Sequence, residues 1–221
     1  GELTVGRARC ILGEGLCAPS GMDRTGTAPQ LCKGCPHRAV FTVLRDLECI
    51  VAGDIGCYTL GALPPFEAID STLCMGASIG MGLGLRHVLP EDQARRVVSV
   101  IGDSTFVHSG LTAMVEMMYN PPPTGHVVII LDNETTAMTG LQEHPGTGVT
   151  LEERSTTKLD FVALARAMGI DRVEVHDVKK DPTAFELALR EALAGDDPAV
   201  FVAKRPCVLK QRRMQGSMRT S

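Results

Sequence analysis

The sequence predicts an α/β protein whose core is a doubly wound, mostly parallel sheet flanked by helices. The runs at 97–101 and 127–131 are almost continuously β-branched or aliphatic, which is typical of strands buried on both faces of a parallel sheet. Segments with helical periodicity separate the expected strands. A chain of 221 residues is long enough for one substantial domain of this kind.

The chain is expected to have three parts. Residues 1–30 are rich in Gly, Pro, Ser and Thr, and we interpret them as a linker or arm that leads in from an upstream segment. Residues 31–209 form the predicted cofactor-binding domain, and residues 210–221 a polar tail.

The domain is predicted to begin with a helix at 37–47, whose apolar residues share one broad face, followed by a short strand at 49–52. A second helix is expected at 77–89. Glycines 76, 80 and 84 recur along it at four-residue spacing, which would let another backbone approach closely. Each glycine costs a helix roughly 1 kcal/mol relative to Ala, so the spacing calls for a packing or ligand reason.

The remaining elements continue the alternation of strand and helix. Between the two buried strands, an apolar stripe formed by Val107, Leu111, Met114, Val115 and Met118 predicts a helix. Further helices are expected at 161–168 and 185–193, and further strands at 172–175 and 199–203. In such sheets ligands bind at the carboxyl ends of the strands, so the residues after 101 and 131 are the first candidates for a site.

Composition excludes several classes of function. The net charge of -4 and the lack of a dense Lys/Arg stripe argue against a nucleic-acid partner. The longest apolar stretch, 75–85, is far shorter than the roughly 20 residues of a membrane span. No signal peptide is visible, so we expect a soluble, cytoplasmic protein whose eight cysteines are not a secreted disulfide framework.

Polar residues follow both buried strands. Gly102-Asp103-Ser104 ends the first and begins a helix, whose free N–H groups suit a phosphate, and Asp132-Asn133 follows the second. The oxygens of Asp103 and Asn133 are of the kind that Mg²⁺ prefers. Taken singly, each segment could equally be an ordinary turn or helix cap. Together, at the ends of two strands that bracket one helix, they predict a metal–phosphate site.

This pair resembles the thiamine-diphosphate fingerprint, Gly-Asp-Gly followed after one helix and strand by Asn-Asn, with Ser104 and Asp132 as departures. Both departures resemble the α subunit of indolepyruvate:ferredoxin oxidoreductases, in its C-terminal half. The resemblance extends over 31–206 and is carried by the runs at 53–61, 74–81, 102–110 and 131–140.

The resemblance implies roles for individual residues. The side chains of Asp103 and Asn133, with the backbone carbonyl of Thr135, would hold Mg²⁺. The predicted cofactor-binding residues are Gly56, Cys57, Met75, Gly76, Ala77, Ser78, Gly102, Asp103, Ser104, Asn133 and Thr135. His108, one turn into the helix after Asp103, is the candidate catalytic residue as a proton relay.

The cysteines allow several interpretations. Cys32 and Cys35 form a C-x-x-C turn, which suits a zinc ion with His37, a redox dithiol, or no ligand at all. Related oxidoreductases hold a [4Fe-4S] cluster through cysteines at corresponding places, and here this implies Cys32, Cys35, Cys57 and Cys207 as ligands. We interpret Cys49 and Cys74 as small buried hydrophobic residues. Cys10 and Cys17 are left unassigned.

The activity that the resemblance implies is oxidative decarboxylation of an aryl 2-oxoacid with coenzyme A, with electrons passing to ferredoxin. The expected partners are a pyrimidine-binding domain or subunit that supplies a Glu, a second oxidoreductase subunit, and further copies in an oligomer. A non-oxidative thiamine-dependent 2-oxoacid decarboxylase or lyase domain and a non-catalytic scaffold are the alternatives.

Overall fold

The computed structural model describes residues 29–217, so the predicted linker or arm lies almost wholly outside the described residues. Its centre is a six-stranded sheet in the order β2-β1-β3-β4-β6-β5, in which every neighbouring pair is parallel. The strands are β1 Ile50–Gly53, β2 Ser71–Thr72, β3 Val97–Gly102, β4 Val127–Asp132, β5 Arg172–His176 and β6 Ala199–Lys204. The predicted fold class is confirmed.

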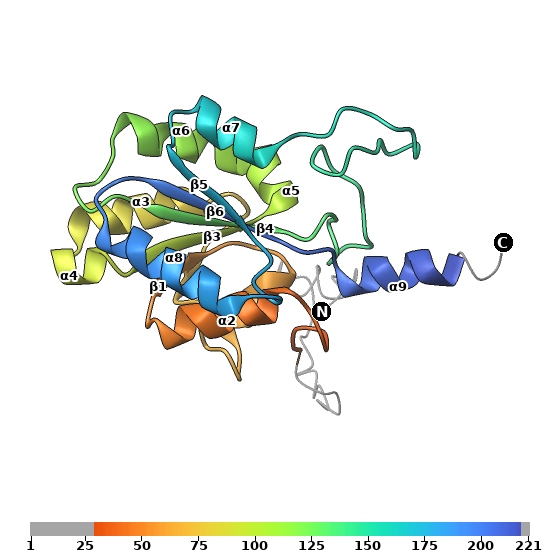
Figure 1. Ribbon diagram of the computed structural model, residues 1–221, viewed down its shortest axis with the longest axis horizontal. Helices are drawn as coiled ribbons and strands as arrows, with labels where there is room; N and C mark the ends of the chain where they lie inside the picture. Colours follow the sequence, from red (N-terminus) through yellow and green to blue (C-terminus); the bar gives the residue numbers. More distant parts are fainter. Residues whose placement is uncertain (1–28, 218–221) are drawn as a thin grey trace, which may run out of the picture.

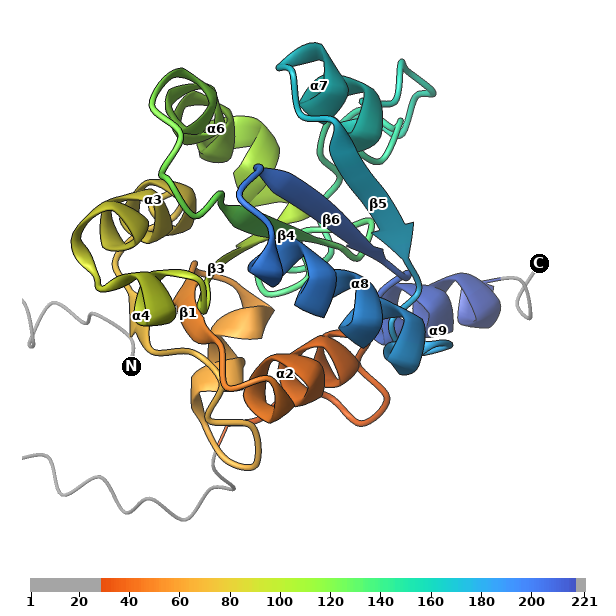
Figure 2. The ribbon, with the colours of Figure 1, turned by 60° about the vertical axis from the view of Figure 1, so that its left-hand side comes forward.

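Helices cover both faces of the sheet (Figures 1 and 2). On one face lie α3, α6 and α7, and on the other α2 and α8. The α-helices are α2 His37–Asp46, α3 Ser78–Val88, α4 Glu91–Ala94, α5 Asp103–Thr105, α6 Leu111–Tyr119, α7 Phe161–Ala167, α8 Pro182–Ala194 and α9 Val208–Ser217. A 3₁₀ helix, η1, spans Cys57–Ala62, and a π-helical turn, η2, spans Phe106–Gly110.

The side chains on the two faces of β4 pack into two separate hydrophobic cores. Val127, Ile129 and Leu131 pack with α2 and α8, whereas Val128 and Ile130 pack with α3, α6 and α7. Successive side chains of a strand point to opposite faces, so a strand covered on both sides must be apolar throughout. Every residue of β3 and β4 is buried, as the sequence predicted.

The predicted stripe on the helix after β3 is confirmed except at one residue. Met114 is buried, and Val107, Leu111 and Met118 are partly buried against the same core. Val115 is 55% exposed, and Met117 is buried instead. The segment begins with a π-helical turn, which takes more residues per turn than an α-helix.

Of the three predicted glycines, only Gly76 is approached closely. It precedes the helix, in a loop, and an added Cβ would collide with the Ser109 side chain and lie 3.1 Å from the Ser109 backbone carbonyl. A Cβ at Gly84 would meet nothing within 4 Å, and one at Gly80 would meet only the Ala113 side chain at 3.9 Å. Within the helix the close contact is made by Gly82, which lies against Ser99 and His126.

The last helix, α9, extends away from the sheet (Figure 1). The predicted boundary between domain and tail, after residue 209, falls inside this helix. Lys210 on its first turn bonds to the loop that follows β4. Across residues 29–217, no helix combines the length and the apolar character that crossing a bilayer requires.

Candidate functional site

A cavity with an empty volume of about 630 Å³ opens where the carboxyl ends of β3 and β4 meet. It is lined by most of the predicted cofactor-binding residues: Gly56, Cys57, Met75, Gly102, Asp103, Ser104, Asn133 and Thr135. The other three, Gly76, Ala77 and Ser78, follow Met75 but do not line it. The structure therefore brings the two predicted strand-end segments to one cavity.

Asp103 is the centre of this arrangement. It is 3% exposed and begins α5 directly after β3. Its Oδ2 accepts hydrogen bonds from the backbone N–H groups of Asn133 and Glu134, at 3.1 and 2.9 Å, and its Oδ1 accepts one from the Ser104 N–H at 2.7 Å. The carboxylate of one strand end is thus fastened to the backbone of the other.

Glu134 adopts an unusual backbone conformation to make this possible. Its φ is 62°, in the left-handed region, which costs a non-glycine residue on the order of 1 kcal/mol or more. Its N–H donates to Asp103, and also lies 3.2 Å from Asp132 Oδ1. The bonds to the two carboxylates compensate for the strained backbone.

The carboxamide of Asn133 is held from both sides. Its Oδ1 accepts a hydrogen bond from the Thr135 N–H at 3.1 Å, which fixes its orientation and turns Nδ2 toward His37 Nε2, also at 3.1 Å. An amide nitrogen only donates, so His37 Nε2 is the acceptor. Burial lowers the pKa of His37 to about 4, so the imidazole is neutral at pH 7 and able to accept.

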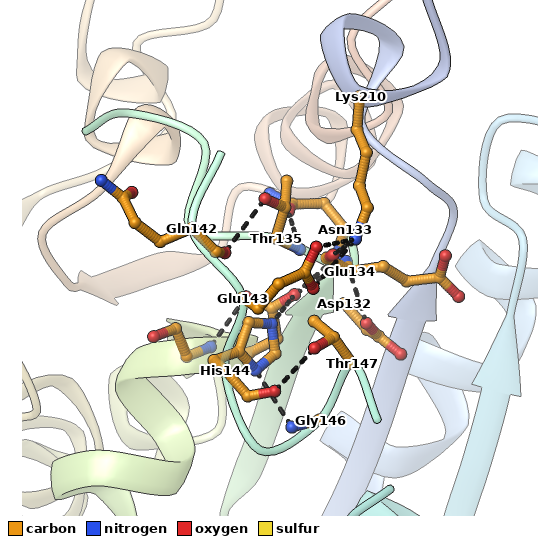
Figure 3. A network of polar contacts seen from close by, with 12 residues as sticks. Asp132, Asn133, Glu134, Thr135, Gln142, Glu143, His144, Gly146, Thr147 and Lys210 are labelled. Atoms are coloured by element: carbon orange, nitrogen blue, oxygen red, sulfur yellow. Dashed lines mark hydrogen bonds and ion pairs between the residues drawn. The ribbon is translucent and has the colours of Figure 1, made fainter. Parts of the chain in front are cut away.

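A second buried imidazole, that of His144, lies on the loop after β4 (Figure 3). This ring approaches Asp103. Its Nδ1 accepts a hydrogen bond from the Gly146 N–H at 3.1 Å, so the proton of the neutral ring is on Nε2. Nε2 lies 3.3 Å from Asp103 Oδ2 but is not aligned for a hydrogen bond, and it has no other hydrogen-bond partner within residues 29–217.

Lys210 of α9 contacts the loop after β4 through its side chain (Figure 3). Its Nζ donates to the backbone carbonyl of Glu134 at 2.7 Å and lies 3.3 Å from both carboxylate oxygens of Glu143. The loop after β4 is therefore fastened to Asp103 on one side and to α9 on the other.

Negative charge gathers at this edge of the sheet. Burial, followed by the negative charge of Asp103, raises the pKa of Asp132 to about 6. Two lysines approach these carboxylates only at long ion-pair distances: Lys204 Nζ is 3.8 Å from Asp132, and Lys158 Nζ is 3.8 Å from Glu134. Asp103 lines the strand-end cavity and Asp132 lies close enough to feel its charge, so a divalent cation in this cavity would offset the negative charge of both carboxylates.

Asp54 was not predicted as a site residue, yet it organises the loop before α3. It is fully buried at the end of β1, and its carboxylate accepts N–H bonds from Ile55, Gly76 and Ser78. Gly76 has a φ of 89°, which few other residues would adopt. The signal available in the sequence was a lone Asp directly after an apolar strand.

Tyr58 explains the glycine before Asp103. Its buried ring lies against Gly102, where an added Cβ would come within 2.6 Å of the Tyr58 Cε1 atom. The Tyr58 hydroxyl donates to the Ile55 carbonyl at 3.1 Å. Gly102 is therefore needed for close packing of this ring at the cavity, which sequence reasoning did not detect.

The four cysteines of the predicted cluster, Cys32, Cys35, Cys57 and Cys207, line one neighbouring cavity of about 420 Å³. Burial raises the pKa of Cys35 to about 11, so without a bound cation its thiol stays protonated. Within residues 29–217, no group of three or more His, Cys, Asp or Glu side chains is already arranged to hold a metal ion. The thiols share a cavity without forming a finished ligand set.

The two cavities share a wall. Cys57, Asn133 and Ala137 line both of them. The backbone N–H of Cys207 also donates to the Asn133 carbonyl at 2.9 Å. The cysteine cavity and the strand-end cavity are therefore direct neighbours.

Three further predictions concern single residues. Cys49 is partly buried against the core, in keeping with a hydrophobic role, but Cys74 is exposed, so the prediction of burial there is wrong. Cys74 lies in the loop before α3, where the apolar run has not yet entered the helix. His108 is exposed on the π-helical turn and does not line the strand-end cavity, so its catalytic role stays a prediction. Cys10 and Cys17 lie outside the described residues.

The chain was then compared with known proteins. Residues 54–203 match the model of the family described as thiamine pyrophosphate enzyme, C-terminal TPP binding domain. The chain is 39% identical over 203 residues to indolepyruvate oxidoreductase subunit IorA of Archaeoglobus fulgidus, covering 87% of this chain and 31% of the relative. It is 40% identical over 197 residues to the same subunit of Pyrococcus abyssi, covering 82% and 29%.

The resemblance drawn from the sequence is thus confirmed, although the chain spans less than a third of the length of these two relatives. Among solved structures it resembles a 2-oxoglutarate:ferredoxin oxidoreductase of Magnetococcus marinus, with a TM-score of 0.64 and 15% identity, covering 80% of this chain and 64% of that one. Benzoylformate decarboxylase of Polynucleobacter necessarius gives a TM-score of 0.52 at 18% identity, covering 77% and 33%. At these identities the likeness concerns the fold alone.

Proposed function

Since the chain belongs to the family of C-terminal TPP-binding domains of thiamine pyrophosphate enzymes, we propose that it holds the diphosphate of thiamine diphosphate through Mg²⁺ at the carboxyl ends of β3 and β4. The supporting observation is the bond between the Asp103 carboxylate and the backbone of Asn133 and Glu134, beside a cavity that both Asp103 and Asn133 line.

The residues present fit these groups. The side chains of Asp103 and Asn133 and the backbone carbonyl of Thr135 would hold Mg²⁺, a set with only one carboxylate among its oxygens. Gly102 and Ser104, together with Gly56, Cys57 and Met75, would surround the cofactor. The loop 76–78, fixed by Asp54, would border it. When bound, thiamine diphosphate supplies the centre at which a 2-oxoacid loses its carboxylate.

The neighbouring cavity supports a [4Fe-4S] cluster held by Cys32, Cys35, Cys57 and Cys207. Such a cluster would accept electrons one at a time, and the shared wall puts its ligands next to the thiamine cavity. This arrangement favours an oxidative reaction over the alternative of a non-oxidative decarboxylase or lyase, which has no use for four thiols beside its cofactor.

For the whole protein we propose oxidation of an aryl 2-oxoacid, of the indolepyruvate type, to its acyl-CoA, with ferredoxin as electron acceptor. IorA, named as an indolepyruvate oxidoreductase subunit, supports this substrate class. A pyrimidine-binding domain or subunit, a second oxidoreductase subunit, coenzyme A and further copies in an oligomer complete the proposal. The free thiols are in keeping with a cytoplasmic location.

Removing Asp103 tests the metal site. In the wild-type chain, Mg²⁺ with thiamine diphosphate should raise the melting temperature, since ligand at 100 times its Kd adds about 2.7 kcal/mol of stability. Asp103→Ala should abolish that rise, and Cys49→Ala, which is remote from the cavity, should keep it. A full-sized rise in the Asp103→Ala chain would show that the metal has been misplaced.

Metal content tests the cluster. After anaerobic purification we expect iron and acid-labile sulfide in equal amounts, a brown colour, and an EPR signal on reduction. Cys57→Ala should lose all three, whereas Cys74→Ala, which changes an exposed cysteine outside the cavity, should keep them. Thiamine diphosphate binding without iron in the wild-type chain would favour the non-oxidative alternative.

A further inference from the structure

The two proposed Mg²⁺ ligands that act through side chains, Asn133 and Asp103, each lie beside a buried histidine. His37, 3% exposed, lies on the first turn of α2, and His144, 5% exposed, lies on the loop after β4. His37 contacts the Asn133 carboxamide, and His144 approaches the Asp103 carboxylate. They reach the site from segments that are far apart in the sequence.

The hydrogen-bond partners fix the two rings in opposite tautomers. His37 Nε2 must accept from the Asn133 amide, so its proton is on Nδ1. His144 Nδ1 must accept from the Gly146 N–H, so its proton is on Nε2, the ring nitrogen that lies 3.3 Å from Asp103 Oδ2. One imidazole thus presents a lone pair and the other a proton, each matched to the group that it faces.

Three buried side-chain atoms of the described residues have no hydrogen-bond partner: Ser78 Oγ, His126 Nδ1 and His144 Nε2. What sets His144 apart is that its atom lies beside the carboxylate of a proposed metal ligand. Buried ring nitrogens normally have a hydrogen-bond partner, yet Nε2 lacks an aligned one within the described residues. The nearest acceptor is Asp103 Oδ2, 3.3 Å away, which already accepts two backbone N–H bonds. A bound cation that turned the carboxylate would allow the Nε2–H group to donate to it.

We propose that His37 and His144 are positioning residues, which hold the Asn133 carboxamide and the Asp103 carboxylate in the orientation that binds Mg²⁺. This inference rests on the proposed function. Neither imidazole would touch the metal or the substrate. Each acts through a ligand, as partners outside a coordination shell do when they fix the angle and basicity of the ligands themselves.

The first test needs no metal. Long-range proton–nitrogen NMR spectra of the ¹⁵N-histidine-labelled 221-residue chain at pH 7 should show one Nδ1–H ring, absent from His37→Gln, and one Nε2–H ring, absent from His144→Gln. A tautomer shared by the two rings would overturn the proposal.

The second test is the affinity for Mg²⁺ at saturating thiamine diphosphate, measured by calorimetry. His37→Leu and His144→Leu should each weaken Mg²⁺ binding by about 10- to 100-fold, which is typical of such partners. The Gln variants should recover most of it, because a Gln amide can accept at position 37 and donate at position 144. A purely structural role would instead lower stability and leave the Mg²⁺ affinity unchanged.

His126 provides the matched control. It is fully buried at the opposite end of β4, with its Nε2 bonded to Ser99. His126→Leu should lower the melting temperature without changing Mg²⁺ affinity. Wild-type affinity in both test Leu variants, or equal weakening by Leu and Gln, overturns the positioning role. If a Leu variant fails to fold, the proposal is judged by the first test, the NMR tautomers of His37 and His144 in the wild-type chain. Absence of Mg²⁺ binding by the wild-type chain contradicts the proposed function itself.

Discussion

The two ends of the parallel strands both bury polar side chains, but in different ways. At the amino end, Arg86 donates from all three guanidinium nitrogens to the carbonyls of Arg95, Val97, Thr124 and Gly125. At the carboxyl end, Asp103 accepts backbone N–H bonds but also borders a cavity. At the amino end, the hydrogen bonds of Arg86 all go to carbonyl groups of the chain. At the carboxyl end, the Asp103 carboxylate also faces a cavity, where it can bind a ligand.

This difference separates a structural polar cluster from a ligand site. Burial and hydrogen bonding alone do not distinguish them, since Arg86 is 2% exposed and Asp103 is 3% exposed. The useful question is whether the partners of a buried group are all internal. Substitutions at the amino end should therefore change stability alone, and those at the carboxyl end should change ligand binding as well.

The largest expected effect is at Arg86. Arg86→Met keeps the aliphatic stem but leaves several buried carbonyls without a donor, so the free energy of unfolding should fall by on the order of 4 kcal/mol. Urea denaturation measures this, and Arg86→Lys should recover part of it. The extra stability given by Mg²⁺ and thiamine diphosphate should be unchanged. If Mg²⁺ and thiamine diphosphate stabilised the Arg86→Met chain less than the wild-type chain, the amino end would also affect ligand binding, and the distinction between the two ends would be wrong.

A smaller effect is expected at His126, as a dependence on pH. Burial, reinforced by the positive charge of Arg86, lowers the pKa of His126 to about 3. The unfolded chain takes up this proton below pH of about 6.5 and the folded chain does not, so acid destabilises the fold. Between pH 6.5 and 5 the wild-type chain should lose about 2 kcal/mol more than His126→Leu. Parallel curves for the two proteins would show that the ring is protonated in the folded state.

The smallest effects should appear on α3, with opposite signs at two glycines. A Cβ at Gly82 would collide with the Ser99 hydroxyl and lie 3.1 Å from His126 Nε2, so Gly82→Ala should cost about 1–2 kcal/mol. A Cβ at Gly84 would meet nothing within 4 Å, so Gly84→Ala should stabilise the helix by about 0.5–1 kcal/mol. Thermal melts of the two variants measure these opposite changes in stability. A loss of stability at Gly84 would reveal a contact beyond the described residues.

The sequence was informative where a physical requirement acts on a continuous segment. Strands β3 and β4 are buried on both faces, so their runs had to be apolar throughout. The two residues of β2 are too few to leave a pattern. The π-helical turn after Asp103 likewise left no mark in the apolar spacing, and Val115 was wrongly placed on the buried face.

For the site, the sequence indicated the strand ends but not what supports them. Asp103 and Asn133 could be predicted because the carboxyl ends of neighbouring parallel strands must meet. The contacts of His37 and His144 depend on how a helix and a loop far apart in the sequence close over those ends. The contact of Tyr58 with Gly102 likewise exists only after folding.

The cysteine cavity has a consequence for how this protein matures. Cys32 precedes the first strand, Cys57 follows it, and Cys207 comes after β6, the last strand in the sequence. The amino-terminal thiols therefore meet their distant partner only after the whole sheet has been assembled, which makes this contact a late event in folding. Any inorganic group that needs all four sulfurs can enter only a nearly native domain, and its uptake would report that the sheet has assembled.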